Sequence, residues 1–145
     1  MKKIRAAVVG YGNIGQYTLQ TLEVAPDFEV AGIVRRQGAK ERPMELENYN
    51  VVSDIAELHD VDVAILALPT RECPAYAKKY LAMGINTVDS FDIHTNIVNY
   101  RAELMPVCKE HGRVSVISAG WDPGSDSIVR MLMQSLAPKG LSYTN

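Results

Sequence analysis

The sequence predicts an α/β fold: a doubly wound, mainly parallel sheet with helices on both faces. Three observations support this prediction. Short runs rich in β-branched residues alternate with segments of helical periodicity, the pattern of strands joined by crossover helices. Glycines at positions 10, 12 and 15 lie between the first such run and the first helical segment. The hydrophobic share of 47% and the charged share of 22% suit one globular domain with an ordinary core.

In the first half, periodicity and turn residues predict four strands and two helices. The strands are expected at residues 4–9, 28–34, 51–52 and 61–68, and the helices at 13–25 and from Ser53 or Asp54 to 58. Residues 36–50 are polar, contain Pro43, and are expected to form a loop with at most a turn of helix. The first helix is expected to turn one face inward, formed by Ile14, Thr18, Leu22 and Ala25.

In the second half, a helix is expected from Pro74 to 83, where Gly84 closes it. Strands follow at 85–89 and 114–118, and between them a helix spans 93–111 and ends at Gly112. One face of that helix gathers Ile97, Tyr100, Leu104, Val107, Cys108 and His111. An amphipathic helix is expected at 125–136, and residues 141–144 start an extended segment. The whole chain, 1–145, is thus expected to be one domain.

Composition and charge exclude several classes of protein. The net charge is −2 and the basic residues are scattered, which argues against a nucleic-acid or membrane-surface partner. No apolar stretch approaches the roughly 20 residues that cross a bilayer, and no secretory signal is seen. Cys73 and Cys108 form no disulfide framework, so the cytoplasm is the expected compartment. His59, His94 and His111 lack the spacing of metal ligands, and no metal site is expected.

The glycine motif Gly10-Tyr11-Gly12-Asn13-Ile14-Gly15 carries the strongest functional signal. Gly10 permits a tight turn, Gly12 lets the backbone approach a pyrophosphate, and Gly15 lets the helix pack close to the strand. The following helix N-terminus presents free N–H groups to the phosphates. The alternative is a glycine-rich structural turn. Because the motif follows a strand, opens a helix and leads to a second strand, it predicts a dinucleotide-binding Rossmann domain.

The end of the second strand indicates which dinucleotide is bound. Domains that prefer NAD place an acid about 20 residues beyond the glycines, where it binds the ribose 2′-hydroxyl. This chain has Arg35-Arg36 there and no acid. Two guanidiniums can hold a 2′-phosphate through charge-assisted hydrogen bonds, so NADP(H) is the expected cofactor. The alternative is a pair of solvated surface arginines.

Three further strand ends should lie on the same edge of the sheet as the glycines, because ligands bind beyond the carboxyl ends of such strands. We call them the strand-end rim: Leu68-Pro69-Thr70, Asp89-Ser90-Phe91-Asp92, and residues 118–124. Asp92 and Asp122 could hold a substrate ammonium, or one could take its proton. Each could equally cap the helix that follows it. Trp121 lies on no periodic apolar face, which favours a role facing a ligand.

Three motifs together carry a resemblance to a known family. Residues 9–15, Val88-Asp89-Ser90-Phe91-Asp92-Ile93-His94 and Ser118-Ala119-Gly120-Trp121-Asp122-Pro123-Gly124 resemble those of meso-diaminopimelate dehydrogenases, and the similarity runs from about residue 3 to 145. The resemblance implies reversible NADP-dependent oxidative deamination at the D-centre of meso-2,6-diaminopimelate. The products would be L-2-amino-6-oxopimelate, ammonia and NADPH. It also implies a place in lysine and amino-acid biosynthesis.

By motif match, Asp92 and Asp122 would bind the reacting amino group and act as catalytic residues, with Trp121 lining the substrate pocket. The cofactor-binding residues implied by the glycine motif, the arginine pair and the resemblance are Gly10, Tyr11, Gly12, Asn13, Ile14, Gly15, Arg35, Arg36, Leu68, Pro69, Thr70, Ser90, Phe91, Asp92, Gly120, Trp121, Asp122 and Pro123. The protein would order the two reactants while the cofactor accepts the hydride.

The chain departs from the family in length. Family members are two-domain chains roughly twice as long, whose remainder supplies the homodimer interface and the groups that hold the distal carboxylates. If the chain is complete, cofactor binding with little turnover is expected; if it is part of a longer enzyme, the dehydrogenase assignment stands. Two alternatives stay open: a non-catalytic NADP(H)-binding module, and a related Rossmann oxidoreductase with another substrate. A sugar oxidoreductase is disfavoured, because Asp89-Ser90-Phe91-Asp92 stands where that group carries an E-K-P-type motif.

Overall fold

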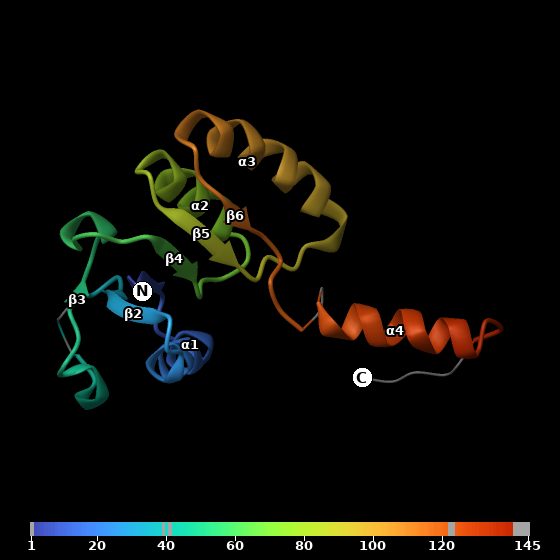
Figure 1. The fold of residues 1–145 in the computed structure, drawn as a ribbon, viewed down its shortest axis with the longest axis horizontal. Helices are drawn as coiled ribbons and strands as arrows, with labels where there is room; N and C mark the ends of the chain where they lie inside the picture. Colours follow the sequence, from blue (N-terminus) through green and yellow to red (C-terminus); the bar gives the residue numbers. More distant parts are fainter. Residues whose placement is uncertain (1, 39, 41, 122–123, 141–145) are drawn as a thin grey trace.

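A six-stranded parallel sheet forms the centre of the molecule (Figure 1). The computed structural model describes residues 2–38, 40, 42–121 and 124–140. The strands are β1 (Ile4–Val9), β2 (Phe28–Val34), β3 (Val51–Val52), β4 (Val63–Leu66), β5 (Asn86–Asp89) and β6 (Ser115–Val116). Their order is β3-β2-β1-β4-β5-β6, and every neighbouring pair is parallel. This is the doubly wound Rossmann order, so the predicted fold class is confirmed.

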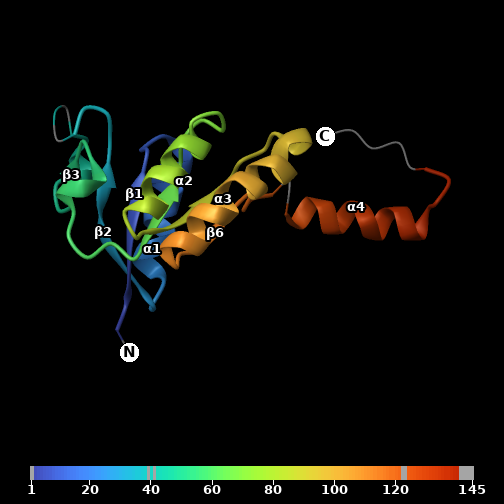
Figure 2. The ribbon, with the colours of Figure 1, turned by 90° about the horizontal axis from the view of Figure 1, so that it is seen from above.

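The central strand β1 shows why helices cover both faces. Successive side chains of a strand point to opposite faces. Ala7 and Val9 pack in one core cluster with residues of α2 (Cys73–Ala82) and α3 (Ile97–His111). Ala6 and Val8 pack in a second cluster with α1 (Asn13–Val24). The two figures show α1 on one side of the sheet and α2 with α3 on the other (Figures 1 and 2).

The inner face of α1 differs from the predicted one. The helix buries Gly15, Leu19 and Leu22, whereas Ile14 is 63% exposed. Leu22 belongs to both faces, but the predicted face wrongly included Ile14 and left out Leu19, whereas the close packing expected of Gly15 is present. A Cβ on Gly15 would lie 2.2 Å from the carbonyl oxygen of Gly10. That close approach turns the Gly15 side of the helix toward the sheet and leaves Ile14 in solvent.

Several predicted bounds were too long or too simple. β4, β5 and β6 are shorter than the expected 61–68, 85–89 and 114–118. The helix expected at 93–111 is a 3₁₀ turn, His94–Asn96, followed by α3, and the expected 53–58 helix is a 3₁₀ turn at Ile55–Glu57 capped by Asp54. The polar loop contains the expected single turn, Met44–Leu46. On α3 the predicted face packs inward except at its last residue, His111, which is exposed.

The predicted amphipathic helix is confirmed as α4 (Ser125–Leu136), but it projects away from the sheet (Figures 1 and 2). Its large apolar side chains are largely exposed: Ile128, Val129, Met131, Leu132, Met133 and Leu136. Across the described ranges, no helix has the length and apolar character that a membrane span requires. The expected extended segment at 141–144 lies outside the described residues.

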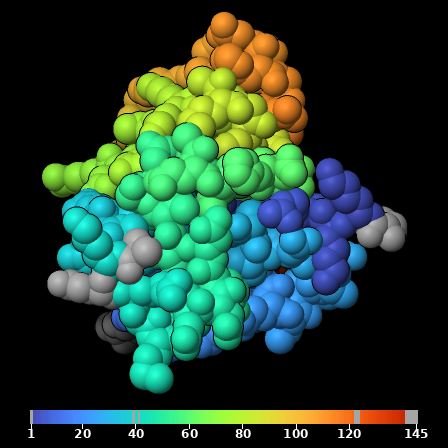
Figure 3. Space-filling model, turned by 90° about the vertical axis from the view of Figure 1, so that its left-hand side faces the viewer, coloured from blue at the N-terminus to red at the C-terminus, as the bar shows by residue number. Residues whose placement is uncertain are grey.

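Seen from the β3 side, the segment that carries β3 and its two flanking 3₁₀ turns covers this end of the molecule (turquoise and green in Figure 3). Leu46 and Ile55, from the two turns, are almost completely buried. Each belongs to a different one of the two core clusters. The β3 side of the sheet is therefore packed against its own connecting segments.

Candidate cofactor cleft and strand-end rim

A cleft of about 540 Å³ opens at the carboxyl ends of β1, β2 and β4. Its lining includes seven of the residues predicted to bind a cofactor: Gly10, Tyr11, Gly12, Arg35, Arg36, Leu68 and Pro69. These residues come from three separate stretches of sequence. The sheet brings them together because parallel strands end at the same edge. We call this hollow the cofactor cleft.

The three glycines have three different surroundings. Gly10 has a φ of +94°, and a Cβ there would lie 2.3 Å from the carbonyl oxygen of Ala67. Gly15 is blocked by the Gly10 carbonyl. Gly12, at the start of α1, has nothing within 4 Å of the position of a Cβ. Gly12 therefore borders open space, and a phosphate can approach its backbone and the α1 N-terminus there.

The two arginines at the end of β2 differ in their partners. The Nη1 of Arg35 is buried and has no hydrogen-bond partner among the described residues. The Nη2 of Arg36 donates to Oε1 of Glu72 at 2.6 Å, although the Arg36 side chain is 79% exposed. A buried guanidinium nitrogen without a partner is costly unless a ligand satisfies it. The open space at Gly12 and this nitrogen both fit a phosphorylated dinucleotide.

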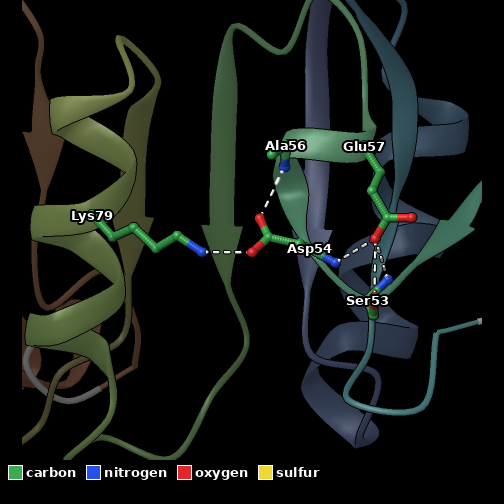
Figure 4. Close-up of polar contacts among 5 residues, drawn as sticks. All are labelled: Ser53, Asp54, Ala56, Glu57 and Lys79. Carbon is green, nitrogen blue, oxygen red and sulfur yellow. Dashed lines mark hydrogen bonds and ion pairs between the residues drawn. The ribbon is translucent and has the colours of Figure 1, made fainter.

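Beside the cleft, which Ser53 lines, a polar network fixes the end of β3 (Figure 4). Oε1 of Glu57 accepts hydrogen bonds from the backbone N–H of Ser53 and Asp54 and from the Ser53 hydroxyl. Asp54 accepts from the Ala56 N–H at 3.0 Å and pairs with Lys79 of α2 at 2.7 Å. The Ala56 N–H and Lys79 lower the pKa of Asp54, and hydrogen bonds from Asp54 and Ser53 lower that of Glu57.

Tyr11 lines the cleft within the glycine motif. Burial raises the pKa of its phenol, and the negative charges of Glu45 and Glu23 raise it further, against the opposing charge of Arg35. The phenol therefore stays protonated near neutral pH and can act there as a hydrogen-bond donor. Tyr11 and Arg35 thus both line the cleft, and the charge of Arg35 acts on the phenol.

At the strand-end rim, Asp92 is held by a neighbouring loop and leaves its carboxylate exposed. The backbone N–H of Asp92 donates to Oγ1 of Thr70 at 3.0 Å, which joins the loop after β4 to the loop after β5. The capping alternative for Asp92 is wrong: Ile93 and Asn96 are the N-caps of the turn and of α3, and no side chain caps either. A carboxylate free of capping suits a ligand-binding role.

The other predicted rim residues take different positions. Phe91 is 1% exposed and packs on Tyr100 with ring centroids 4.6 Å apart, so only its backbone can face a ligand. Ser90 is exposed, and its Cβ lies 3.9 Å from where a Cβ of Gly120 would stand. Trp121 is 67% exposed and takes no part in the core. Asp122 and Pro123 lie outside the described residues, so their predicted roles stay predictions.

Six lining residues of the cleft were missed by the sequence prediction: Val9, Val34, Gln37, Ser53, Ala67 and Tyr76. Gln37 and Ser53 each lie just beyond a strand, so the rule that pointed to Arg35 and Leu68 could have found them. Tyr76 comes from the inner side of α2, for which the sequence offers no comparable signal. Asn13 and Ile14, in the first turn of α1, are exposed beside the glycines and do not line the cleft.

Other features of the described chain do not compete with this site. A hollow of about 680 Å³ lies near the amino ends of β1, β4 and β5, the opposite edge from that used by ligands in this fold. No group of three or more His, Cys, Asp or Glu residues among those described could hold a metal ion. Cys73 is buried, and burial together with the charge of Asp89 raises the pKa of its thiol to about 11.

Comparison with known proteins places this geometry in context. Residues 4–89 match the model of an oxidoreductase family with an NAD-binding Rossmann fold. A meso-diaminopimelate D-dehydrogenase of Bacteroides fragilis is 67% identical over 145 residues, all of this chain and 48% of the relative. One of Ureibacillus thermosphaericus is 35% identical over 147 aligned residues, 99% of this chain and 45% of the relative. The chain spans about half the length of the curated relatives it matches.

Solved structures agree with these relatives. The DAP dehydrogenase of Corynebacterium glutamicum in complex with DAP superposes with a TM-score of 0.75 at 33% identity, covering 94% of this chain and 42% of that one. An engineered D-amino acid dehydrogenase bound to NADP⁺ superposes with a TM-score of 0.75 at 32% identity, covering 93% and 42%. Both similarities extend beyond the β5 end, so they include part of the strand-end rim.

Proposed function

Because this chain belongs to the oxidoreductase family with an NAD-binding Rossmann fold, we propose that it is the cofactor half of an NADP-dependent amino-acid dehydrogenase. In this proposal residues 1–145 form the NADP(H)-binding domain, and a substrate and dimerisation domain lies outside the chain. The observation that carries the proposal is that the glycine motif, the arginine pair and Asp92 come to one edge of the sheet in a chain 67% identical to a meso-diaminopimelate dehydrogenase.

NADP(H) is the cofactor that suits the cleft. The open backbone at Gly12 and the α1 N-terminus would take the pyrophosphate. Arg35, with its unpartnered buried nitrogen, and Arg36 would take the 2′-phosphate. No described acid follows β2 where an NAD-preferring domain would place one. The carboxylate that does reach the arginine pair is Glu72, which holds Arg36 in an ion pair that the 2′-phosphate would have to replace.

The proposed substrate is meso-2,6-diaminopimelate, reacting at its D-centre to give L-2-amino-6-oxopimelate and ammonia. Asp92, exposed at the strand-end rim, would bind the amino group, together with Asp122 and beside Trp121. One carboxylate takes a proton from the ammonium, so that the nitrogen lone pair can form the imine as the α-hydrogen leaves. When bound, the nicotinamide supplies the hydride acceptor. Water then adds to the imine and ammonia leaves.

The activity can be tested in a chimera in which this chain replaces the matching half of the Bacteroides fragilis relative. We expect NADP reduction with meso-diaminopimelate and little with the LL-isomer, which has no D-centre. Asp92→Asn should lower kcat by about 100-fold or more, the usual size of a lost general base. A folded chimera that binds NADP but does not reduce it with meso-diaminopimelate would overturn the proposed activity.

The cofactor assignment can be tested in the chain itself by calorimetry with NADP and NAD. Two lost charged contacts of roughly 1.5–3 kcal/mol each predict that Arg35→Ser with Arg36→Val weakens NADP by about 100-fold or more. NAD affinity should change by less than about threefold, because NAD lacks the 2′-phosphate. Arg101→Ser with Arg113→Val removes the same charge far from the cleft and serves as the control. Equal losses for NADP and NAD would show that the pair does not bind the 2′-phosphate.

A second candidate function is a non-catalytic NADP(H)-binding module, because the cleft formed by the glycine motif and the arginine pair would serve such a module equally well. It predicts NADP binding by the chain but no turnover in the chimera. The exposed Asp92 and Trp121 favour the enzyme instead, because a binding module has no use for an amine-binding rim.

Two further parts of the proposal concern the whole protein. We propose the cytoplasm as its compartment, which the two free cysteines support, and a homodimer of the longer chain.

A further inference from the structure

The carboxylate of Asp89, at the end of β5, joins two loops of the strand-end rim. It is 2% exposed. Its Oδ1 accepts hydrogen bonds from the backbone N–H of Phe91 at 3.0 Å and of Ser118 at 3.1 Å. Its Oδ2 accepts from the hydroxyl of Tyr100 on α3 at 2.6 Å. One buried side chain thus connects the loop after β5, the segment after β6 and the helix between them.

The segment after β6 needs such a restraint. Ser118 has a φ of +57°, in the left-handed region that side chains other than glycine rarely adopt. The next residue is held as well, because the N–H of Ala119 donates to the Asp89 carbonyl at 2.7 Å. Gly120, the residue after Ala119, lies against Ser90. The path of the chain toward Trp121 is therefore set at Asp89.

The same loop after β5 is fixed a second time at Asp92, whose N–H is bound by Thr70. From these contacts we propose that Asp89 is a positioning residue. It holds residues 90–92 and 117–121 together and so sets where Asp92 and Trp121 stand beside a bound nicotinamide. This inference rests on the proposed function, since it assigns a role to those two residues in the same site.

Two other roles for Asp89 are less consistent with these contacts. It cannot touch a substrate, because its carboxylate is buried and its oxygens accept three hydrogen bonds from the protein. A role confined to stability would not require contacts with both rim segments. Thr87, two residues earlier on β5, is buried in the same way, and its hydroxyl bonds to the hydroxyl of Ser115 on β6, at 2.8 Å, away from the rim.

Four variants distinguish a positioning role of Asp89 from an effect of its charge and from an effect on stability. Asp89→Asn keeps a carbonyl oxygen that can accept both N–H groups and an amide that can donate to the Tyr100 oxygen. Asp89→Ala removes all three contacts. Adding Ser118→Gly to Asp89→Ala removes the backbone strain of the left-handed conformation at residue 118 without restoring any hydrogen bond. Thr87→Val, which removes one buried hydroxyl contact between β5 and β6, is the matched control.

The readout uses the 145-residue chain with NADPH as the probe. Trp121 is the only tryptophan, so energy transfer from its emission to bound NADPH reports where the 117–121 segment stands. We expect transfer in the wild type, in Asp89→Asn and in Thr87→Val, and loss of most of it in Asp89→Ala. The NADPH dissociation constant of Asp89→Ala should rise by less than about tenfold, because the cleft itself is intact. Adding Ser118→Gly to Asp89→Ala should not restore the transfer, because glycine removes strain but restores none of the hydrogen bonds that hold the segment.

The outcomes divide clearly. A wild type that does not bind NADPH refutes the proposed function. A wild type that binds NADPH without transfer, or an Asp89→Ala chain that transfers as the wild type does, overturns the positioning role while leaving cofactor binding intact. If Asp89→Asn loses as much transfer as Asp89→Ala, the charge of Asp89 and not its hydrogen bonds is responsible, and the inference fails. If Asp89→Ala does not fold, Tyr100→Phe replaces it, with a smaller loss of transfer expected and unchanged transfer contradicting the proposal.

Discussion

Adding one methyl group to Gly15 or to Gly12 should have opposite consequences. At Gly15 a Cβ would stand 2.2 Å from the Gly10 carbonyl oxygen, and real Cβ atoms essentially never come closer than 3.0 Å. Helix α1 and the Gly10 turn must therefore separate by at least about 0.8 Å, the difference of these two distances. At Gly12 the added Cβ meets no protein atom within 4 Å, and φ is an ordinary −89°.

These distances translate into different free energies of unfolding. Overpacking of this kind costs about 1–3 kcal/mol, and a backbone oxygen cannot rotate away, so we take the upper end. The better helix propensity of alanine offsets about 1 kcal/mol. The net loss of about 2 kcal/mol lowers Tm by about 4–8 °C in a chain of this size. For Gly12→Ala, the poorer N-cap and the lower entropy of the unfolded chain offset each other, so Tm should hardly move.

NADPH affinity should be affected the other way round: Gly12→Ala should weaken it more than Gly15→Ala does. The methyl group of Gly12→Ala would occupy the space that the pyrophosphate needs, which costs about 10–100-fold in NADPH affinity in a stable protein. Gly15→Ala should weaken NADPH only as far as the shifted turn distorts the cleft. Thermal unfolding followed by circular dichroism, with NADPH titration of each variant, measures both quantities. A Gly15→Ala protein as stable as the wild type, or a Gly12→Ala protein with unchanged NADPH affinity, would refute this division of roles.

Three further predictions concern the surroundings of the cleft. Glu72→Gln releases Arg36 from its ion pair, so NADPH should bind a few-fold more tightly at low salt, a gain that calorimetry at high salt should no longer detect. The pKa of Asp54 is lowered from its usual 3.8, so Asp54 stabilises the fold above that pH and this contribution disappears as pH falls through the lowered pKa. Urea unfolding of Asp54→Ala should therefore differ from the wild type at pH 7 more than at pH 3, and a constant difference would contradict the shift. Burial raises the pKa of Cys73 to about 11, so Cys73 should resist iodoacetamide in the native chain at pH 8 and react after unfolding, as mass spectrometry of the labelled peptides would show.

Local pattern was sufficient to predict the doubly wound parallel sheet and the edge at which the cleft lies. The strands after which Gly10, Arg35 and Leu68 stand were recognisable from β-branched runs, and the common edge follows from parallel pairing alone. On α1 the apolar periodicity failed, because it turned Ile14 inward and left out Leu19, although the glycine motif had predicted the close packing of Gly15.

The polar partners could not be predicted, because they join residues distant in sequence. The ion pair of Arg36 with Glu72 spans 36 residues, and the bond from Ser118 to Asp89 spans 29. Whether Asp92 caps a helix also depended on where the helix begins, which single-sequence patterns place only to within a few residues. Each of these details affects the chemistry of the site more than the identity of the fold.

The two outermost strands, β3 and β6, are only two residues long. A long bare edge strand invites another chain to pair with its backbone, and such pairing propagates into aggregates. Edges this short offer few free N–H and carbonyl groups, so growth of the sheet from one molecule to the next is disfavoured. Self-association of the chain at high concentration should therefore proceed through the apolar side chains of α4, respond to mild detergent, and leave the β-sheet signal in circular dichroism unchanged.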